Sequence, residues 1–232
     1  MTLSLCVREP YRTDDGRQFR FGVAVTTRLP GVGAICPFVS EHGAVAVQSH
    51  ASDWLGDRTL AYLADGLAVD DAVDALLAAD DNRRNRQIHG VDADGSVAVT
   101  GSGCVEFAGH REAGQFTAAG NLLASEDVLA ATARSYETTA FGDLPLAERL
   151  IDALAAGVEA GGDRRDSLTV GSAAVRVVDT AEPTPRTFYN DLRVDASETP
   201  VADLRTTYEA ALLGYEQSRE AYADEVGDVS PE

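Results

Sequence analysis

The chain has 232 residues, 44% of them hydrophobic, which is enough for one large domain with a sizeable core. Its 38 acidic and 19 basic residues give a net charge of -19, and every basic residue is Arg because the sequence contains no Lys. Binding to phosphate backbones needs a basic face, so this composition excludes nucleic acid as an expected partner. The acidic residues are spread along the chain, a pattern typical of proteins kept soluble in concentrated salt.

Short apolar segments bounded by Gly, Pro or charge predict that the first quarter of the chain is a run of antiparallel strands. The expected strands are residues 2–7, 19–27, 32–38 and 43–49. A helix follows, capped by Ser52 or Asp53 and ending at Gly66. Apolar residues at helical spacing predict a second helix over residues 69–79.

A second set of strands comes next in the sequence. The segment Asp92-Ala93-Asp94-Gly95 is typical of a tight hairpin turn, so strands 86–91 and 96–100 are expected to pair. Further strands are expected over residues 104–107 and 115–119. The remaining expected elements are helices 126–137 and 146–158, strands 168–178 and 187–194, a last helix 200–222, and a frayed acidic tail 224–232.

The blocks of strands and helices predict an α+β fold in a single domain over residues 1–223. Neither a linker rich in Pro, Gly or Ser nor an internal repeat divides the chain. Two antiparallel sheets packed face to face, with helix pairs outside, would bury both sets of strands in one four-layer αββα sandwich. A plain two-layer α+β fold is the less specific alternative.

The three cysteines indicate a reducing compartment. Cys6, Cys36 and Cys104 are odd in number and far apart, and they form no C-x-x-C motif, so each is expected to be a small buried hydrophobe. The sequence shows neither an apolar run long enough to cross a bilayer nor a basic segment followed by an apolar one at its start. We therefore expect a cytoplasmic protein without a membrane partner.

An ordered set of short motifs runs along most of the chain. The motifs are Thr2-Leu3-Ser4-Leu5, Gly22-Val23-Ala24-Val25 with Arg28, Val32-Gly33-Ala34, Ala46-Val47-Gln48, Gly90-Val91-Asp92-Ala93-Asp94-Gly95, Thr100-Gly101 with Cys104, Ala108-Gly109-His110, Gly120-Asn121-Leu122-Leu123-Ala124, Ala147-Glu148-Arg149-Leu150, Gly161-Gly162-Asp163-Arg164-Arg165 and Asp191-Leu192-Arg193-Val194-Asp195. In this order they resemble the domain-of-unknown-function family 1028, which is grouped with the N-terminal-nucleophile (Ntn) hydrolases. The resemblance implies an αββα sandwich of the proteasome type, in agreement with the order of strands and helices.

The sequence also departs from the pattern of that family. Members usually have an Asn-Pro pair shortly after the Gln, where this chain has Ser52-Asp53-Trp54. The Trp that usually precedes Ala-Gly-His is Phe107 here, and the stretch before Asp191 is short. These departures concern the substrate pocket more than the fold.

The resemblance implies that Thr2 is a nucleophile, because an Ntn hydrolase uses the side chain of its first residue and the α-amine of the same residue as base. An α-amine has an unperturbed pKa of about 7.7–8.0, so a useful fraction is neutral near pH 7. Removal of Met1 would expose Thr2, and a small second residue favours that removal. If Met1 is retained, Thr2 is an ordinary strand residue without a free amine. Ser4 and Cys6 share its strand face and would serve only after further cleavage.

Three further residues are candidates for the catalytic site through the same resemblance. Thr26-Thr27-Arg28 is similar to the Asp-Ser-Arg of proteasome subunits, so Arg28 could hold the nucleophile's surroundings or a substrate carboxylate, although an ordinary surface Arg is the strong alternative. Asp163 and Ser167 resemble the Asp and Ser that approach the N-terminal Thr in proteasome-like folds. A helix end at Gly161-Gly162 explains the same segment without catalysis.

Gln48, His110 and Asn121 are the candidate substrate contacts. Asn121 could donate to an oxyanion or bind a substrate amide, or it could simply occupy a left-handed turn. A lone His such as His110 is more often structural. No metal or cofactor is expected, because the four His lack paired spacing and Gly103 stands where a calcium loop beginning at Asp92 requires Glu.

Taken together, these residues predict a cofactor-free Ntn amidohydrolase that cleaves a C–N bond in a small amino-acid- or peptide-like substrate. The protein is also expected to form a homo-oligomer. Two alternatives remain at this point: an inactive member of the fold that binds a small ligand, and a structural assembly subunit. The identity of the substrate and the oligomeric state do not follow from the sequence.

Overall fold

The structure is a computed structural model and describes residues 1–165, 167–181 and 187–222. Its strands are β1 (Thr2–Thr13), β2 (Gly16–Thr27), β3 (Pro37–Ser40), β4 (Gly43–Ser49), β5 (Arg86–Asp92), β6 (Ser96–Thr100), β7 (Gly109–Ala113), β8 (Phe116–Asn121), β9 (Gly171–Asp179) and β10 (Asp191–Ser197). Its helices are α1 (Asp53–Ala64), α2 (Val69–Ala79), α3 (Asp127–Thr139), α4 (Leu146–Glu159) and α5 (Pro200–Ala221). The strands form a six-stranded sheet in the order β10-β9-β2-β1-β8-β7 and a four-stranded sheet in the order β3-β4-β5-β6.

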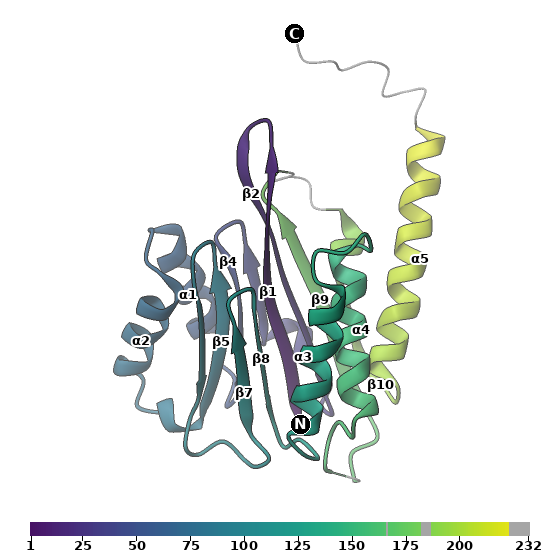
Figure 1. Cartoon of the computed structure of the whole chain (residues 1–232). Coiled ribbons are helices and arrows are strands. Elements are labelled where there is room, and N and C mark those ends of the chain that lie inside the picture. The colour runs from purple at the N-terminus through teal and green to yellow at the C-terminus, as the bar shows by residue number, and fades with distance from the viewer. Residues whose placement is uncertain (166, 182–186, 223–232) are drawn as a thin grey trace.

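Three apolar clusters hold the layers together. One packs the outer face of the six-stranded sheet against α3, α4 and α5, and another packs the four-stranded sheet against α1 and α2. The third lies between the two sheets and includes Cys6, Val23 and Ala44. Figure 1 shows this succession of helices, sheet, sheet and helices. The predicted α+β sandwich of two antiparallel sheets is confirmed, because each sheet buries one face on its helices and the other on the second sheet.

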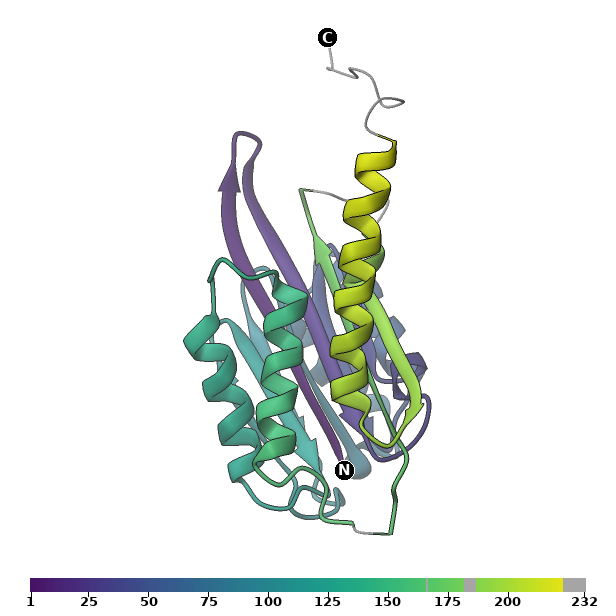
Figure 2. The same ribbon diagram turned by 90° about the vertical axis from the view of Figure 1, so that its right-hand side faces the viewer.

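The first strand runs through the middle of the larger sheet and carries the amino terminus into the sandwich. Thr2 lies opposite Thr27 of β2 on one side and Asn121 of β8 on the other. Side chains alternate along β1, so that Leu3 joins the core under the helices while Ser4 reaches Gln48 of the other sheet. Figure 2 shows the start of β1 at the same end of the molecule as the loops next to α4 and α5.

Two predicted strands are wrong. Residues 32–38 begin with a 3-10 turn, Val32–Ala34, after Gly31 with φ 79°, and β3 starts only at Pro37. This turn lets the chain cross β9 closely, since a Cβ on Gly33 would lie 2.9 Å from the Cβ of Ala174. Residues 104–107 form a loop in which the carbonyls of Val105 and Phe107 accept from Leu122 and Leu123. The edge strand is instead β7, which pairs with β8. The predicted tail 224–232 lies outside the described residues.

A buried ion pair connects α4 to the first hairpin. Arg149 Nη2 donates to Glu9 Oε2 at 2.7 Å, and the two side chains are only 2% and 3% exposed. The Tyr136 hydroxyl and the Phe141 backbone N–H also donate to Glu9, while Arg149 donates to the Leu144 carbonyl. Burial alone would raise the pKa of Glu9, but the bonds from Arg149, Phe141 and Tyr136 together with the charge of Arg149 outweigh burial and hold that pKa below its usual value.

Candidate active site

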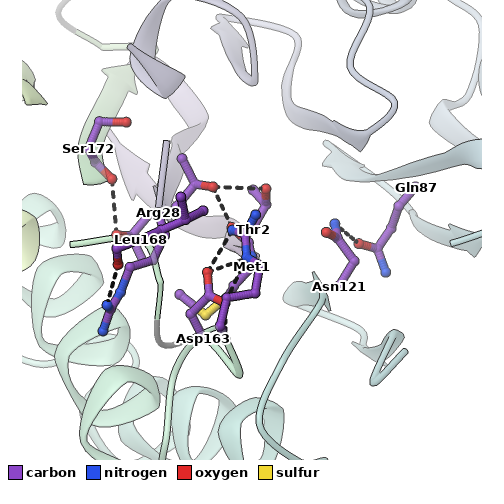
Figure 3. A network of polar contacts seen from close by, with 11 residues as sticks. Met1, Thr2, Arg28, Gln87, Asn121, Asp163, Leu168 and Ser172 are labelled. Carbon is purple, nitrogen blue, oxygen red and sulfur yellow. Dashed lines mark hydrogen bonds and ion pairs between the residues drawn. The ribbon is translucent and has the colours of Figure 1, made fainter. Parts of the chain in front are cut away.

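The first residue of the chain is enclosed by the fold. Met1 is 4% exposed, and its side chain belongs to the apolar cluster between the six-stranded sheet and its helices. Its α-amine donates to Asp163 Oδ2 at 2.6 Å. Figure 3 shows Met1 and Asp163 facing each other beside Thr2. The structure therefore confines the chain's first amine to a buried acidic site.

A glycine turn after α4 places Asp163 beneath the amino terminus. Gly161 and Gly162 have φ values of 129° and 53°, which favour glycine, and they reverse the chain direction. The Ala124 N–H donates to the Gly162 carbonyl at 2.9 Å, and Leu123 forms a β-bridge with Asp163. The turn is thus fastened to the segment after β8, so the position of the carboxylate is set by backbone geometry.

Arg165 balances the charge of the Asp163 carboxylate. Its guanidinium donates through Nη2 to Oδ2 at 2.7 Å and through Nε to Oδ1 at 3.0 Å. Burial would raise the pKa of Asp163, but the bonds from Arg165 and from the α-amine lower it below its ordinary value. Burial also lowers the pKa of the Met1 α-amine from 8.0 to about 6, with Asp163 opposing that shift in part. The pKa values of Asp163 and of the α-amine can both be lowered, because Arg165 keeps the carboxylate paired even when the amine is neutral.

The hydroxyls of Thr2 and Thr27 form a short chain with the first carbonyl group. Thr2 Oγ1 lies 3.3 Å from Thr27 Oγ1, to which it donates, and the Thr27 hydroxyl donates to the carbonyl oxygen of Met1. The register of the β1–β2 hairpin sets this arrangement, since Thr2 and Thr27 are directly opposite. The Thr2 hydroxyl is therefore linked through the Thr27 hydroxyl to the carbonyl oxygen of the amide that precedes it.

A cavity of about 230 Å³ opens beside these groups. Its wall includes Met1, Thr27, Arg28, Asp163 and residues 198–202 around the start of α5. Arg28 is half-buried, and its Nη1 donates to the Leu168 carbonyl at 2.6 Å. The cavity thus combines a cation, a carboxylate and a hydroxyl within a volume suited to a small molecule.

Asn121 and Gln48 belong to one buried polar network between the two sheets. Gln87 Oε1 accepts from Asn121 Nδ2 at 3.1 Å and from Gln48 Nε2 at 2.9 Å. Asn121 is next to Thr2 because their strands pair there, and Figure 3 shows it held between Gln87 and the Thr2 region. Gln48 lies one contact further from Thr2, where it accepts from Ser4 at 2.8 Å.

The structure brings Thr2, Arg28, Asp163 and Asn121 to one end of the sandwich, whereas two other candidates are exposed to solvent. His110 is exposed and bonds to Thr100 at 2.9 Å, and Ser167 is exposed too. Neither residue is among the described residues that line the cavity.

Sequence reasoning missed the roles of Thr27 and Arg165. A signal for Thr27 was available, because a tight turn after Thr13 places it opposite Thr2 by counting along both strands. Arg165 stands two residues after Asp163 in a segment already singled out, yet side-chain pairing across that turn depends on its backbone geometry.

A Ser–His contact is enclosed in the core. Ser4 Oγ lies 2.6 Å from His89 Nε2, and His89 Nδ1 lies 2.8 Å from the Thr117 hydroxyl. All three residues are 0% exposed, and burial lowers the pKa of His89 to about 3. This neutral His therefore ties the two sheets together, and it stands apart from the described lining of the cavity.

The free energy of unfolding of the Met1-retaining protein is expected to rise with pH between 6 and 8. The α-amine pKa is about 6 when folded and 8.0 when unfolded, so the unfolded state binds more protons in this window. The gain is at most about 1.4 kcal/mol per pH unit. Urea titrations at pH 6.5, 7.2 and 8 measure it, with Met1 verified by intact mass. A fall in stability above pH 8 would instead mean that the ion pair with Asp163 raises the amine pKa.

The fold and the site together define the structural class of this protein. It is a sandwich of two antiparallel sheets between helical layers, and its central strand buries its own amino terminus beside a cavity. Residues 2–204 match a family of unknown function (DUF1028), and the chain belongs to this family, as predicted. It is similar to a crystal structure of a Silicibacter pomeroyi protein of the same family. That similarity has a TM-score of 0.72 and 26% identity, over 90% of this chain and 85% of that chain. None of the curated proteins matches the chain.

Proposed function

We propose that this protein is an Ntn amidohydrolase that cleaves a C–N amide bond in a small amino-acid- or peptide-like substrate. Thr2 is the nucleophile after Met1 is removed, and its own α-amine is the base. The observation that carries the proposal is the position of Thr2 at the buried start of β1. There its hydroxyl lies 3.3 Å from that of Thr27, next to the cavity lined by Asp163 and Arg28.

In the proposed reaction the Thr2 hydroxyl oxygen attacks the substrate carbonyl carbon, and the hydroxyl proton passes to the Thr2 α-amine. The Thr27 hydroxyl, which now donates to the Met1 carbonyl, then donates to the substrate oxygen as negative charge develops on it. The ammonium group protonates the leaving nitrogen while the C–N bond breaks, and the acyl group remains on Thr2 as an ester. Water, deprotonated by the same amine, hydrolyses the ester and restores the hydroxyl.

The other residues at this end of the sandwich hold the substrate and the nucleophile. Asp163 supplies a carboxylate that is paired with Arg165 and that binds the Met1 α-amine while Met1 is present. Arg28 lines the cavity while its guanidinium is anchored on the Leu168 carbonyl, which suits it to a substrate carboxylate. Asn121 is oriented by Gln87 beside Thr2, which suits it to a substrate amide.

The second candidate function is that of an inactive member of the fold, which binds a small ligand or builds an assembly. The burial of Met1 favours it, because a retained Met1 fills the position next to Thr2 and already satisfies Asp163 at 2.6 Å. In that state Thr2 has no free amine, and the proposed base is absent. The two functions therefore differ in the first residue of the protein.

The intact mass of the protein isolated from its natural source decides between them. The Ntn proposal expects a mass that lacks one Met residue, with Thr2 as the first residue in amino-terminal sequencing. A full population that retains Met1 would overturn the hydrolase proposal and support the inactive alternative.

We also propose that the protein works as a homo-oligomer in a reducing, salt-rich cytoplasm. Cys6 and Cys36 are buried free thiols, which supports the reducing compartment. Leu213 within α5 and Tyr222 directly after it are 56% and 58% exposed, and they support self-association. No helix in the described ranges has the length and apolar character needed to span a membrane. Light scattering at several protein concentrations tests the assembly.

Salt is expected to stabilise the protein. Raising KCl from about 0.1 M to about 1 M shortens the Debye length from about 10 Å to about 3 Å, which screens repulsion among surface carboxylates. The net charge of -19 makes this repulsion the dominant surface term, so the urea midpoint is expected to increase. A midpoint that stays constant or falls would contradict the salt adaptation. Sucrose at the same osmolality is the control for effects unrelated to charge.

A further inference from the structure

Met1 is bound by its surroundings in the way that a small aminoacyl group would be bound. Its α-amine donates to Asp163 Oδ2 at 2.6 Å, and its carbonyl oxygen accepts from the Thr27 hydroxyl. Its side chain is enclosed in the apolar cluster that also contains Leu123 and Val201. Each of the three groups of an α-amino acid residue therefore has its own partner at this position.

These partners are in place independently of Met1. The paired strand β1 begins at Thr2, so the sheet register is defined without Met1. Arg165 and the glycine turn hold the Asp163 carboxylate, and strand pairing holds Thr27. Removal of Met1 leaves an oriented carboxylate, an oriented hydroxyl and an apolar recess that joins the cavity of about 230 Å³.

We propose that the position of Met1 is the acyl subsite of the mature enzyme, and that its substrates are amides of an L-amino acid with a free α-amine and an unbranched apolar side chain. The substrate amine donates to Asp163, the scissile carbonyl accepts from Thr27, and the side chain replaces that of Met1. This inference rests on the proposed function, because it deepens the choice of substrate at the same nucleophile.

The geometry allows a separate substrate at this position with a small shift. The Met1 carbonyl carbon is bonded to the Thr2 nitrogen at about 1.33 Å, whereas the carbonyl carbon of a separate substrate is not bonded to that nitrogen and awaits attack about 3–3.5 Å from the Thr2 hydroxyl oxygen. A substrate must therefore lie further from the Thr2 nitrogen than the Met1 carbonyl does, toward the adjoining cavity, of which Met1 itself forms part of the wall.

The same geometry excludes acyl groups whose nitrogen is blocked. The α-amine is 2.6 Å from a carboxylate whose side chain is 0% exposed, so an acyl group on this nitrogen has no room on the Asp163 side. An N-acetyl group would both remove donors from the nitrogen and collide with Asp163. A comparison of binding by free-amine and N-acetylated amides therefore distinguishes this subsite from a pocket that accepts any amide.

Binding is tested without turnover in a Thr2→Ala protein that is released from a fusion partner so that residue 2 is its first residue. Isothermal titration calorimetry with L-methionine amide is expected to show binding, and N-acetyl-L-methionine amide is expected to bind at least tenfold more weakly. The same Thr2→Ala protein with Met1 retained is expected to bind neither compound, since Met1 occupies the subsite. Equal affinity for the two compounds, binding of neither by the trimmed protein, or equal binding by the Met1-retaining protein would each overturn the inference.

Asp163→Asn in the trimmed protein gives a second measurement. It is expected to lower the affinity for L-methionine amide at least tenfold while the weak affinity for the N-acetyl compound stays unchanged. Circular dichroism checks the fold of this variant. If it does not fold, the comparison of the two ligands on the trimmed protein that keeps Asp163 still tests the inference. An affinity for L-methionine amide that is unchanged in a folded Asp163→Asn protein would overturn the role of Asp163.

Hydrolysis by the trimmed protein with Thr2 intact separates this inference from the function on which it rests. Ammonia release from L-methionine amide, with at least tenfold less from the N-acetyl compound, supports both. Selective binding without any hydrolysis or covalent labelling of Thr2 would support the subsite and overturn the hydrolase proposal. Equal hydrolysis of both compounds would support the hydrolase proposal and overturn the proposed subsite.

Discussion

Thr2→Ala is expected to abolish turnover and covalent labelling while leaving the fold intact. Loss of a nucleophile lowers kcat by about ten-thousand-fold or more in hydrolases whose catalytic groups act as a unit. Among the residues that the structure describes, the Thr2 hydroxyl forms one hydrogen bond, at 3.3 Å to Thr27, so the free energy of unfolding is expected to change by no more than about 1 kcal/mol. The probe is an epoxyketone, which reacts with the hydroxyl and the α-amine of an amino-terminal Thr, and mass spectrometry locates its adduct.

Two matched variants make this result specific. Thr2→Ser keeps a hydroxyl on the first residue and is expected to retain labelling. Cys6→Ala removes the buried thiol on the same strand face and is expected to leave labelling unchanged, which excludes a cysteine adduct. Ala, Ser and Thr are all small second residues, so Met1 is removed equally, as intact mass verifies. An adduct that forms equally well on Thr2→Ala protein would sink the role of Thr2.

The first hairpin shows how much of the candidate site can be predicted from the sequence. The predicted strands 2–7 and 19–27 fall within β1 and β2, but both observed strands continue toward a tight turn between Thr13 and Gly16. Counting outward from that turn places Thr27 opposite Thr2, a pairing that the predicted strand ends did not give. The glycine pair before Asp163 marks the end of α4, but the sequence does not state where the next residue points. The 2.6 Å contact between Met1 and Asp163 spans 162 positions and depends on how the turn is fastened to Ala124. Such a contact follows from the folded backbone alone.

The network around Asn121 was beyond sequence reasoning for a related reason. Gln48, Gln87 and Asn121 lie on three strands from both sheets, and they meet only because the sheets pack face to face. Alternation predicts which face of a strand is buried, but it does not predict how the facing sheet is placed. The loop over residues 104–107 also looked like a strand, since its apolar residues are bounded by turn signals although its backbone bonds go to Leu122 and Leu123.

Removal of either partner of the Glu9–Arg149 pair is expected to destabilise the protein severely. Arg149→Met leaves the Glu9 carboxylate buried without its cationic partner, and Glu9→Leu leaves the Arg149 guanidinium buried without its anionic partner. Each variant is expected to lower the free energy of unfolding by about 3–5 kcal/mol. The double variant Glu9→Leu with Arg149→Met removes both charges and is expected to recover about half of that loss. Urea denaturation measures all three, and the double-mutant cycle isolates the coupling.

Asp94→Asn is the control, because its partner Arg17 is 52% exposed and Asp94 itself 89%, and it is expected to change stability by less than about 1 kcal/mol. The pH dependence supplies an independent signature. The folded-state pKa of Glu9 is depressed, so its contribution is fully present above the unfolded value of about 4.3 and is lost as pH falls through the folded value. Below about pH 4 the protein with Glu9 is therefore expected to lose stability more steeply than the double variant. Parallel acid profiles would mean that this ion pair is not what holds α4 to the first hairpin.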